Sequence, residues 1–379
     1  MKIYYDENMP FAKEFFSEFG QLVAFSGREV SSVDLADADV LLVRSVTQVN
    51  QQLLANNSQL QFVGTATIGV DHIDQAYLDN RNIPFYSAPG CNAVSVAEYV
   101  ISSLVIMAER YLLDMFSLTV GIVGAGNTGS KLSEKLTALG IKHLLCDPPL
   151  VKKYRENGQA VPSNFVSMEQ VLACDVISLH VPLVYDGECP TYHLLNEKNL
   201  AQLSARQILI NVCRGEIIDN QALLTLKQQA WPTKLVLDVW EKEPDILLPL
   251  IDFADIATAH IAGYSVEGKA RGSEMLYQAL CKQLNRPVKK QLSHFLPVAL
   301  IDHVNIAADF DAIMLNQLVK LVYDVRRDDA IFRHNITRQG FDYIRKSYPA
   351  RREFSAVTTT FTHSAKSDVP HRLGFSHLK

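Results

Sequence analysis

The chain has 379 residues, enough for two or three domains, and 48% of them are hydrophobic, which is ample for buried cores. A formal net charge of −5 and a sequence pI of about 6.1 exclude the basic surplus typical of nucleic-acid-binding proteins. The longest apolar stretch, residues 99–108, is too short to cross a membrane, and we expect no secretory segment. Six scattered cysteines lack the paired spacing of metal or redox sites, so we expect reduced thiols, no metal and a cytoplasmic location.

The first ninety or so residues alternate short apolar runs with amphipathic segments. We predict strands at residues 2–5, 22–25, 40–43, 62–64 and 84–86, and helices near 10–19, 50–55 and 73–79. This strand–helix rhythm is typical of a parallel sheet with both faces covered, so we expect a flavodoxin-like α/β substrate domain. A long helix at about 94–110 follows it.

A second, more regular α/β series comes after this helix. We predict strands at 119–123, 142–146, 175–180, 207–213, 234–240 and 255–259. Six strands with helices between them indicate a doubly wound, Rossmann-type nucleotide fold. A helix near 266–284 should return to the first domain, which would then comprise residues 1–93 and 265–287, with the nucleotide domain at 94–264. The remainder, 288–379, should form a small α+β domain that ends in a loosely ordered tail from residue 358.

A glycine-rich loop, Gly124-Ala125-Gly126-Asn127-Thr128-Gly129, follows the first strand of the nucleotide domain and opens an expected helix at 130–139. Such glycines allow a tight turn and close approach of a pyrophosphate to the helix N-terminus. Asp147 lies 23 residues after Gly124, where a carboxylate would accept hydrogen bonds from the adenosine ribose and repel a 2′-phosphate. The loop therefore favours NAD over NADP, the alternative being a structural turn with a capping aspartate.

Arg214, Glu243 and His260 each follow a predicted strand of the same sheet. Ligands of open parallel sheets bind beyond the carboxyl ends of the strands. An arginine can clamp a carboxylate with two hydrogen bonds, and a histidine beside a glutamate can act as a general base. Together they fit oxidation of a 2-hydroxy acid, although each alone could be a surface ion pair or a core residue.

These segments resemble the signatures of the D-isomer-specific 2-hydroxyacid dehydrogenases. The matching stretches are Asn211–Glu216 (NVCRGE), Leu237–Pro244 (LDVWEKEP), His260–Tyr264 (HIAGY), Gly64–His72 (GTATIGVDH) and Ala88–Glu98 (APGCNAVSVAE). Three further stretches, Arg44–Thr47 (RSVT), Tyr323–Asp329 (YDVRRDD) and Arg345–Phe354 (RKSYPARREF), resemble a subgroup of that family whose hydroxy-acid substrate carries a phosphate. The resemblance extends to about residue 355.

The resemblance implies individual roles. Ser45, Thr67 and Tyr264 would contact the substrate, and Cys213, Asp238 and Gly263 would contact NAD together with the glycine-rich loop and Asp147. It further implies a homodimer formed by the C-terminal region, with Phe332, Phe341, Tyr343 and Tyr348 as apolar anchors. The family often has threonine after the residue that corresponds to His180, but this chain has Val181.

The substrate phosphate needs cationic partners, for which Arg44 and one of Arg345, Arg351 or Arg352 are candidates, if these are not surface ion pairs. Two other functions stay open. One is another member of the family, such as a phosphoglycerate or simple D-2-hydroxyacid dehydrogenase. The other is an NAD(H)-sensing binding protein that keeps the fold as a regulatory scaffold.

Overall fold

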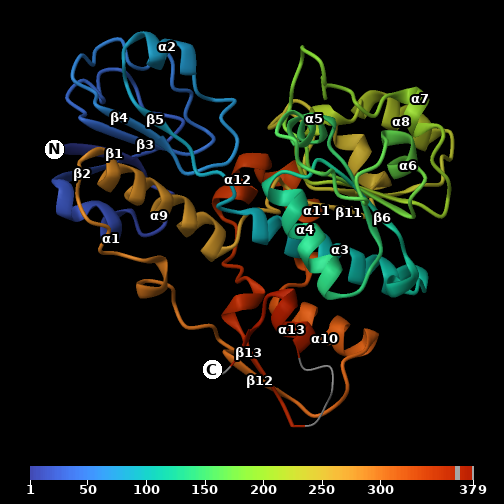
Figure 1. Ribbon diagram of the computed structural model, residues 1–379. Helices are drawn as coiled ribbons and strands as arrows, with labels where there is room; N and C mark the ends of the chain where they lie inside the picture. Colours follow the sequence, from blue (N-terminus) through green and yellow to red (C-terminus); the bar gives the residue numbers. More distant parts are fainter. Residues whose placement is uncertain (363–367, 378–379) are drawn as a thin grey trace. The chain divides into compact units, whose positions relative to one another are not determined.

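A computed structural model describes residues 1–362 and 368–377 of the chain (Figure 1). By its internal contacts the chain divides into two compact units, Met1–Asn92 with Tyr264–Val298, and Ala93–Gly263 with Ala299–Lys379. The division of the chain into three domains, with a separate domain at 288–379, stays a prediction.

The first unit is built on a five-stranded parallel sheet with the order β2-β1-β3-β4-β5, the flavodoxin-like order. The strands are β1 (Lys2–Asp6), β2 (Gln21–Phe25), β3 (Val40–Val43), β4 (Phe62–Thr65) and β5 (Phe85–Tyr86). Its helices are α1 (Ala12–Phe16), α2 (Gln75–Asn80) and α9 (Val266–Gln283), with 3-10 turns η1 (Ser17–Phe19) and η5 (Leu292–His294). Strands β3 and β4 are buried on both faces, which is why they appear as continuous apolar runs.

Helix α9 packs on β4 although more than 190 residues separate them in sequence (Figure 1). A glycine on β4 permits this close packing, because a Cβ at Gly64 would meet the Leu276 side chain at 3.0 Å. Leu276, Tyr277 and Leu280 of the helix join Phe15 and Phe16 in one apolar cluster. The chain therefore returns to the first sheet after it has completed the second.

The second unit contains a six-stranded parallel sheet with the order β11-β10-β9-β8-β6-β7. The strands are β6 (Val120–Val123), β7 (His143–Cys146), β8 (Val176–Leu179), β9 (Ile208–Asn211), β10 (Lys234–Leu237) and β11 (Ile256–Ala257). Around them lie α3 (Ala93–Tyr111), α4 (Asn127–Ala138), α5 (Pro148–Glu156), α6 (Met168–Leu172), α7 (Glu197–Leu200), α8 (Asn220–Gln228), η2 (Met115–Ser117), η3 (Gly215–Ile217) and η4 (Leu248–Phe253). The strand order reverses between β6 and β8, the switch point at which doubly wound folds bind nucleotides.

Residues 299–379 belong to this second unit and carry their own small parallel sheet, β12-β13-β14. Its elements are β12 (His303–Ile306), α10 (Ala312–Val322), α11 (Val325–Gln339), α12 (Phe341–Lys346), η6 (Phe354–Ala356), β13 (Thr358–Phe361), α13 (Asp368–Leu373) and β14 (Ser376–His377). Helix α11 lies against α3 and β11. Its Asp329 accepts a hydrogen bond from the amide of Ala257 at 2.8 Å.

Three expectations from the sequence were wrong. Residues 51–56 form turns rather than a helix, because the segment spans little more than one turn and Asn57 bonds the carbonyls of Leu35 and Ala38 instead. The tail is ordered where it is described, since β13, α13 and β14 lie within residues 358–362 and 368–377, while 363–367 and 378–379 lie outside the described residues. Phe332 and Phe341 lie in the core of the second unit, so neither can anchor a partner subunit.

Candidate active site

The glycine-rich loop joins β6 to α4 at the switch point of the second sheet. Gly124 has a φ of +93°, and a Cβ on it would lie 2.8 Å from the carbonyl carbon of His180. A Cβ on Gly129 would lie 1.9 Å from the carbonyl oxygen of Gly124, whereas a Cβ on Gly126 would meet nothing within 4 Å. No side chain caps the N-terminus of α4, which begins after Gly126. Two glycines thus close the turn and the third leaves open space before the helix, an arrangement that fits a dinucleotide pyrophosphate.

Asp147, the predicted ribose ligand, follows β7. Its Oδ2 accepts a hydrogen bond from the amide of Ala125 at 2.9 Å, and its Oδ1 accepts one from Leu150 at 2.9 Å as the N-cap of α5. The capping role that the sequence left open is therefore present, and it fixes the carboxylate beside the glycine-rich loop. Contact with ribose stays a prediction.

His180 was not assigned any role from the sequence, because a lone histidine at a strand end carries no distinctive signal. It follows β8, directly across the switch point from β6, and burial lowers its pKa to about 3. Its Nε2 lies 2.8 Å from Ser178 Oγ. The imidazole is therefore neutral near the glycine-rich loop. Burial likewise raises the pKa of the Cys213 thiol to about 11, so this cysteine stays protonated.

His260 lies in a tight segment that begins after β11. It has a φ of +55°, and its amide donates to the carbonyl of Asp238 at 2.6 Å. The Asp238 carboxylate is 1% exposed and accepts hydrogen bonds from Thr258 Oγ1 at 2.6 Å, Ile261 N at 2.8 Å and Ala262 N at 2.9 Å. Burial raises the pKa of Asp238, while the charge of His260 and these hydrogen bonds oppose that rise. Asp238, predicted only as an NAD contact, therefore also holds the segment that carries His260.

Glu243 and His260 form a direct pair. His260 Nδ1 lies 2.7 Å from Glu243 Oε2, and Glu243 Oε1 accepts a hydrogen bond from the amide of Trp240 at 3.0 Å. A carboxylate can only accept, so Nδ1 carries the proton of this bond. Burial alone would raise the pKa of Glu243, but the charge and hydrogen bond of His260 and the charge of Arg345 hold it below its ordinary value. The glutamate is therefore ionised and fixes the orientation of the imidazole.

Arg214 lies in the segment after β9, next to the loop of Glu243. Asn211 Nδ2 donates to the carbonyl of Arg214 at 2.9 Å, and Arg214 Nη1 donates to the carbonyl of Cys213 at 2.8 Å. The following residue must be glycine, because a Cβ on Gly215 would lie 1.9 Å from the carbonyl carbon of Trp240. The backbone segments that carry Arg214 and Glu243 therefore pack directly against each other. Within the second unit, the structure brings the loops of the three candidate residues together at the carboxyl ends of β9, β10 and β11.

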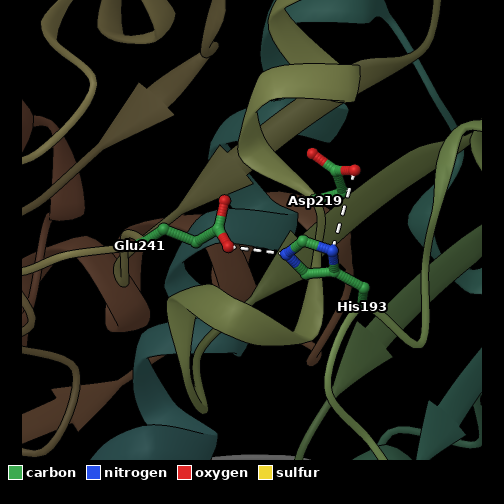
Figure 2. A group of neighbouring side chains, drawn as sticks. All are labelled: His193, Asp219 and Glu241. Atoms are coloured by element: carbon green, nitrogen blue, oxygen red, sulfur yellow. Dashed lines mark hydrogen bonds and ion pairs between the residues drawn. The ribbon is translucent and has the colours of Figure 1, made fainter.

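A second polar cluster consists of His193, Asp219 and Glu241 (Figure 2). His193 Nε2 lies 2.7 Å from Glu241 Oε1, and Nδ1 lies 3.7 Å from Asp219 Oδ2. Figure 2 shows the two carboxylates approaching different ring nitrogens, which suits a bracketed imidazole better than three ligands around one ion. Glu241 also accepts a hydrogen bond from the amide of Asn220 at 2.8 Å. The cluster fixes the chain two residues before Glu243. No pattern in the sequence reveals it, because its members are far apart in the chain.

The first unit carries the predicted substrate contacts Ser45 and Thr67 after two of its own strands, and Tyr264 just before α9. Ser45 follows β3 and is exposed. Thr67 follows β4 and donates from Oγ1 to the carbonyl of Gly69 at 2.8 Å. Tyr264 lies between two cations, with the Arg44 guanidinium 5.5 Å and the Lys269 ammonium 5.0 Å from its ring centroid. Their contacts with a substrate stay predictions.

Two family models match the chain. One, described as "D-isomer specific 2-hydroxyacid dehydrogenase, NAD binding domain", covers residues 104–262. The other, described as a domain of unknown function (DUF3410), covers residues 295–374. The first includes the glycine-rich loop, Arg214, Glu243 and His260. The second begins in the last residues of the first unit and covers most of the C-terminal part of the second unit.

Solved structures of several dehydrogenases share the fold. D-lactate dehydrogenase from Aquifex aeolicus, complexed with NAD and lactic acid, has a TM-score of 0.60 and 25% identity, over 75% of this chain and 95% of its own. NAD+-bound 3-phosphoglycerate dehydrogenase of Entamoeba histolytica has a TM-score of 0.64 and 23% identity, over 78% and 99% of the two chains. Fold and matched domain thus define an NAD-dependent 2-hydroxyacid dehydrogenase.

Curated relatives narrow the class. Erythronate-4-phosphate dehydrogenase of Colwellia psychrerythraea is 62% identical over an alignment of 391 positions, gaps included. The alignment covers 99% of this chain and 100% of the relative. The enzyme of the same name from Tolumonas auensis is 53% identical and covers 99% of both chains. The chain belongs to the erythronate-4-phosphate dehydrogenase family. The resemblance found in the sequence is confirmed.

Proposed function

We propose that the chain oxidises 4-phospho-D-erythronate to (R)-3-hydroxy-2-oxo-4-phosphooxybutanoate while NAD is reduced, a step in pyridoxal 5′-phosphate (vitamin B6) biosynthesis. The observation that carries the chemistry is the 2.7 Å pair of His260 and Glu243, at the carboxyl edge of a sheet with an NAD-binding loop. The substrate is taken from the relatives that share about half or more of their residues with this chain.

In this proposal His260 is the general base. Because Glu243 accepts the hydrogen bond from Nδ1, Nε2 is left with its lone pair to take the proton of the C2 hydroxyl group. NAD, when bound, supplies the acceptor for the hydride that leaves the same carbon. Arg214 would hold the substrate carboxylate with two parallel hydrogen bonds. In the reverse direction the protonated imidazole returns its proton to the oxygen.

NAD would be held by the loop of Gly124, Gly126, Asn127, Thr128 and Gly129 and by Asp147, with Cys213, Asp238 and Gly263 beside the nicotinamide. Support comes from the open space at Gly126 and the uncapped N-terminus of α4. Ser45, Thr67 and Tyr264 would contact the substrate from the first unit.

For the substrate phosphate we propose Arg44. It stacks on Tyr264 in the first unit, and its Nη1 donates to the carbonyl of Asn8 at 3.2 Å. Arg351 is excluded from this role because it is buried and bonded to main-chain carbonyls. An Arg44→Ala variant should raise the KM for 4-phosphoerythronate about 10-fold or more, yet leave the KM for unphosphorylated erythronate unchanged. Equal effects on both substrates would remove Arg44 from this role.

The deciding experiment compares NADH formation with 4-phospho-D-erythronate, 3-phosphoglycerate, glycerate and lactate. We expect kcat/KM for 4-phospho-D-erythronate to exceed that for each other substrate by at least about 100-fold. Glycerate and lactate have no phosphate to bind, and the phosphate of 3-phosphoglycerate would be misplaced, so each loses several hydrogen bonds. A preference for 3-phosphoglycerate would point to another member of the family. No turnover on any of them would favour a regulatory NAD(H)-binding protein.

We further propose that the protein is a homodimer formed through the C-terminal part of the second unit. Phe332 and Phe341 are buried and cannot form the dimer contact. The exposed aliphatic side chains of Leu300, Ile301 and Ile313 support such a contact instead. Light scattering should give twice the chain mass for the wild type and a smaller mass for Ile313→Asp. Val33→Asp, at an equally exposed valine of the first unit, is the matched control. A monomeric wild type would end this proposal.

No helix within the described residues is long and apolar enough to cross a membrane. We propose a cytoplasmic location, which fractionation of cells that express the protein would test.

A further inference from the structure

The C-terminal region reaches the segment that carries His260 through one arginine. Arg351 is 3% exposed, and its Nη2 donates to the carbonyl of Ala262 at 2.6 Å and to that of Ser95 at 3.0 Å. Ala262 lies two residues after His260, and Ser95 lies in α3. All of these residues belong to the second unit. The guanidinium therefore links the segment that carries His260 to helix α3.

The peptide groups after His260 are fixed from two sides. Asp238 accepts the amides of Ile261 and Ala262, at 2.8 and 2.9 Å. Arg351 binds the carbonyl oxygen of Ala262. The residues from His260 to Gly263 lie outside any helix or strand, and His260 has a left-handed φ, so these hydrogen bonds help to fix the position of the segment. Asp238 fixes the donors of this segment, and Arg351 fixes an acceptor.

The buried surroundings of Arg351 leave one nitrogen of its guanidinium without a hydrogen-bond partner among the described residues. Its guanidinium carbon lies 4.1 Å from the ring centroid of Tyr323, and Asp328 accepts hydrogen bonds from the hydroxyl groups of Tyr323 and Tyr348. The nitrogen left over is Nη1, which is itself buried. Apolar residues of similar volume often stabilise a fold as well as a buried charge or better. The guanidinium does supply something that an apolar side chain cannot, which is a directed donor to the Ala262 carbonyl.

We propose that Arg351 is a positioning residue for His260, and that holding the catalytic segment in place is one function of the region matched as a domain of unknown function. Arg351 touches neither substrate nor cofactor in this proposal. It acts through Ala262 on the placement of the imidazole. The inference rests on the proposed role of His260.

The test is Arg351→Met, which keeps most of the side-chain volume and removes the donors. Misplacing a catalytic group by about 1 Å can cost about 100-fold in rate. We expect kcat with 4-phosphoerythronate to fall about 10- to 100-fold, while NADH affinity, measured by fluorescence, changes less than about threefold. Hydrogen exchange of the peptide that contains Ile261 and Ala262 should become faster.

Arg333→Met is the matched control. Arg333 also comes from the C-terminal region and donates to two main-chain carbonyls, those of Ile251 and Ala254, at 2.8 and 2.6 Å. These carbonyls precede β11 rather than follow it. We expect its kcat to stay within about twofold of the wild type, even if some stability is lost.

A second variant covers the case in which Arg351→Met does not fold. Arg351→Ala leaves room for a free guanidinium ion, and millimolar methylguanidinium should then restore part of kcat in Arg351→Ala but not in other slow variants such as His260→Asn. Wild-type kcat in folded Arg351→Met, equal losses in the Arg351 and Arg333 variants, or no rescue of Arg351→Ala would overturn the proposal. If His260→Asn itself kept full activity, the proposed function would fail instead, so the two failures are distinguishable.

Discussion

The carboxyl edges of the two parallel sheets carry polar residues of different kinds. In the second unit, His260 is hydrogen-bonded through its ring to the Glu243 carboxylate and through its amide to the Asp238 carbonyl. The Asp238 carboxylate accepts the amide of Ile261, so both carboxylates have fixed partners. In the first unit, Ser45 is exposed and Tyr264 is flanked by two cations that have long side chains. The difference fits the proposed roles, because a proton-transfer group needs a rigid position, whereas groups that bind a charged, flexible substrate can remain at the surface.

We expect the greatest loss of activity from a substitution at the carboxyl edge of the second sheet, called here the rigid edge. His260→Asn should lower kcat by about 10²- to 10⁴-fold, because the general base is lost. NADH binding, followed by fluorescence titration, should change little, since the glycine-rich loop is untouched. Turnover at the wild-type rate would show that His260 does not transfer the proton.

Glu243→Gln should lower kcat by about 100-fold, since the amide cannot stabilise the imidazolium that forms during turnover. A pH effect accompanies this loss. The pKa of Glu243 is below its ordinary value in the folded chain, so its ionised carboxylate contributes stability above pH 4.5 that is lost as the pH falls through the folded pKa. Denaturant unfolding should therefore show Glu243→Gln less stable than the wild type at pH 7, with the gap closing once the pH has fallen through the folded pKa of Glu243, which lies below 4.5. A gap that persists there would contradict the assignment.

A smaller effect is expected from the exposed edge. Thr67→Val keeps the shape of the side chain and removes its hydroxyl group, which lies 2.7 Å from Thr65 Oγ1. We expect the KM for 4-phosphoerythronate to rise about 10-fold with kcat within about threefold, because a substrate hydrogen bond is lost and the base is unaffected. Steady-state kinetics decide this. A fall in kcat at constant KM would show that the first unit contributes to the chemical step.

The smallest kinetic effect should come from Glu98, a buried carboxyl group of α3 that has no role in the proposed reaction. Burial raises the pKa of Glu98 to about 7, although Lys135 at 3.1 Å opposes the rise. Since the folded pKa is above the ordinary value, folding favours the protonated form, and stability falls as the pH rises from about 4.5 to 7. Glu98→Gln should flatten this part of the unfolding profile, a change of up to about 3 kcal/mol, and leave kcat and KM unchanged. An unaltered pH profile of unfolding would contradict it.

Much of the fold followed from local patterns. Strands buried on both faces, such as β3 and β8, are short apolar runs that stand out in the sequence. The ends of strands were predicted less well. β9 ends at Asn211 rather than residue 213, because the Asn211 side chain turns to the backbone of Cys213 and Arg214. Such a side-chain bond to the backbone has no signal in hydropathy.

Of the candidate site, the sequence predicted the groups proposed to do the chemistry but not the residues that hold them in place. His260 and Glu243 were recognisable by residue type and place, and their pairing is observed at 2.7 Å. The support from Asp238, from the His193 cluster and from Arg351 depends on contacts between residues that are distant in sequence. Phe332 is fully buried within the chain and therefore cannot be a dimer anchor. The sequence alone does not show whether an aromatic residue on an amphipathic helix faces the chain's own core or a partner.

The hydrogen bond from Ala257 to Asp329 has a consequence for fragments of this protein. β11 is the last strand of its sheet, and a bare outer strand offers unpaired amides that recruit strands of other molecules. Helix α11 blocks that growth by satisfying the amide of Ala257 and covering the strand. A shortened chain that stops near residue 298 would lose this protection, so aggregation rather than simple inactivity is its expected fate.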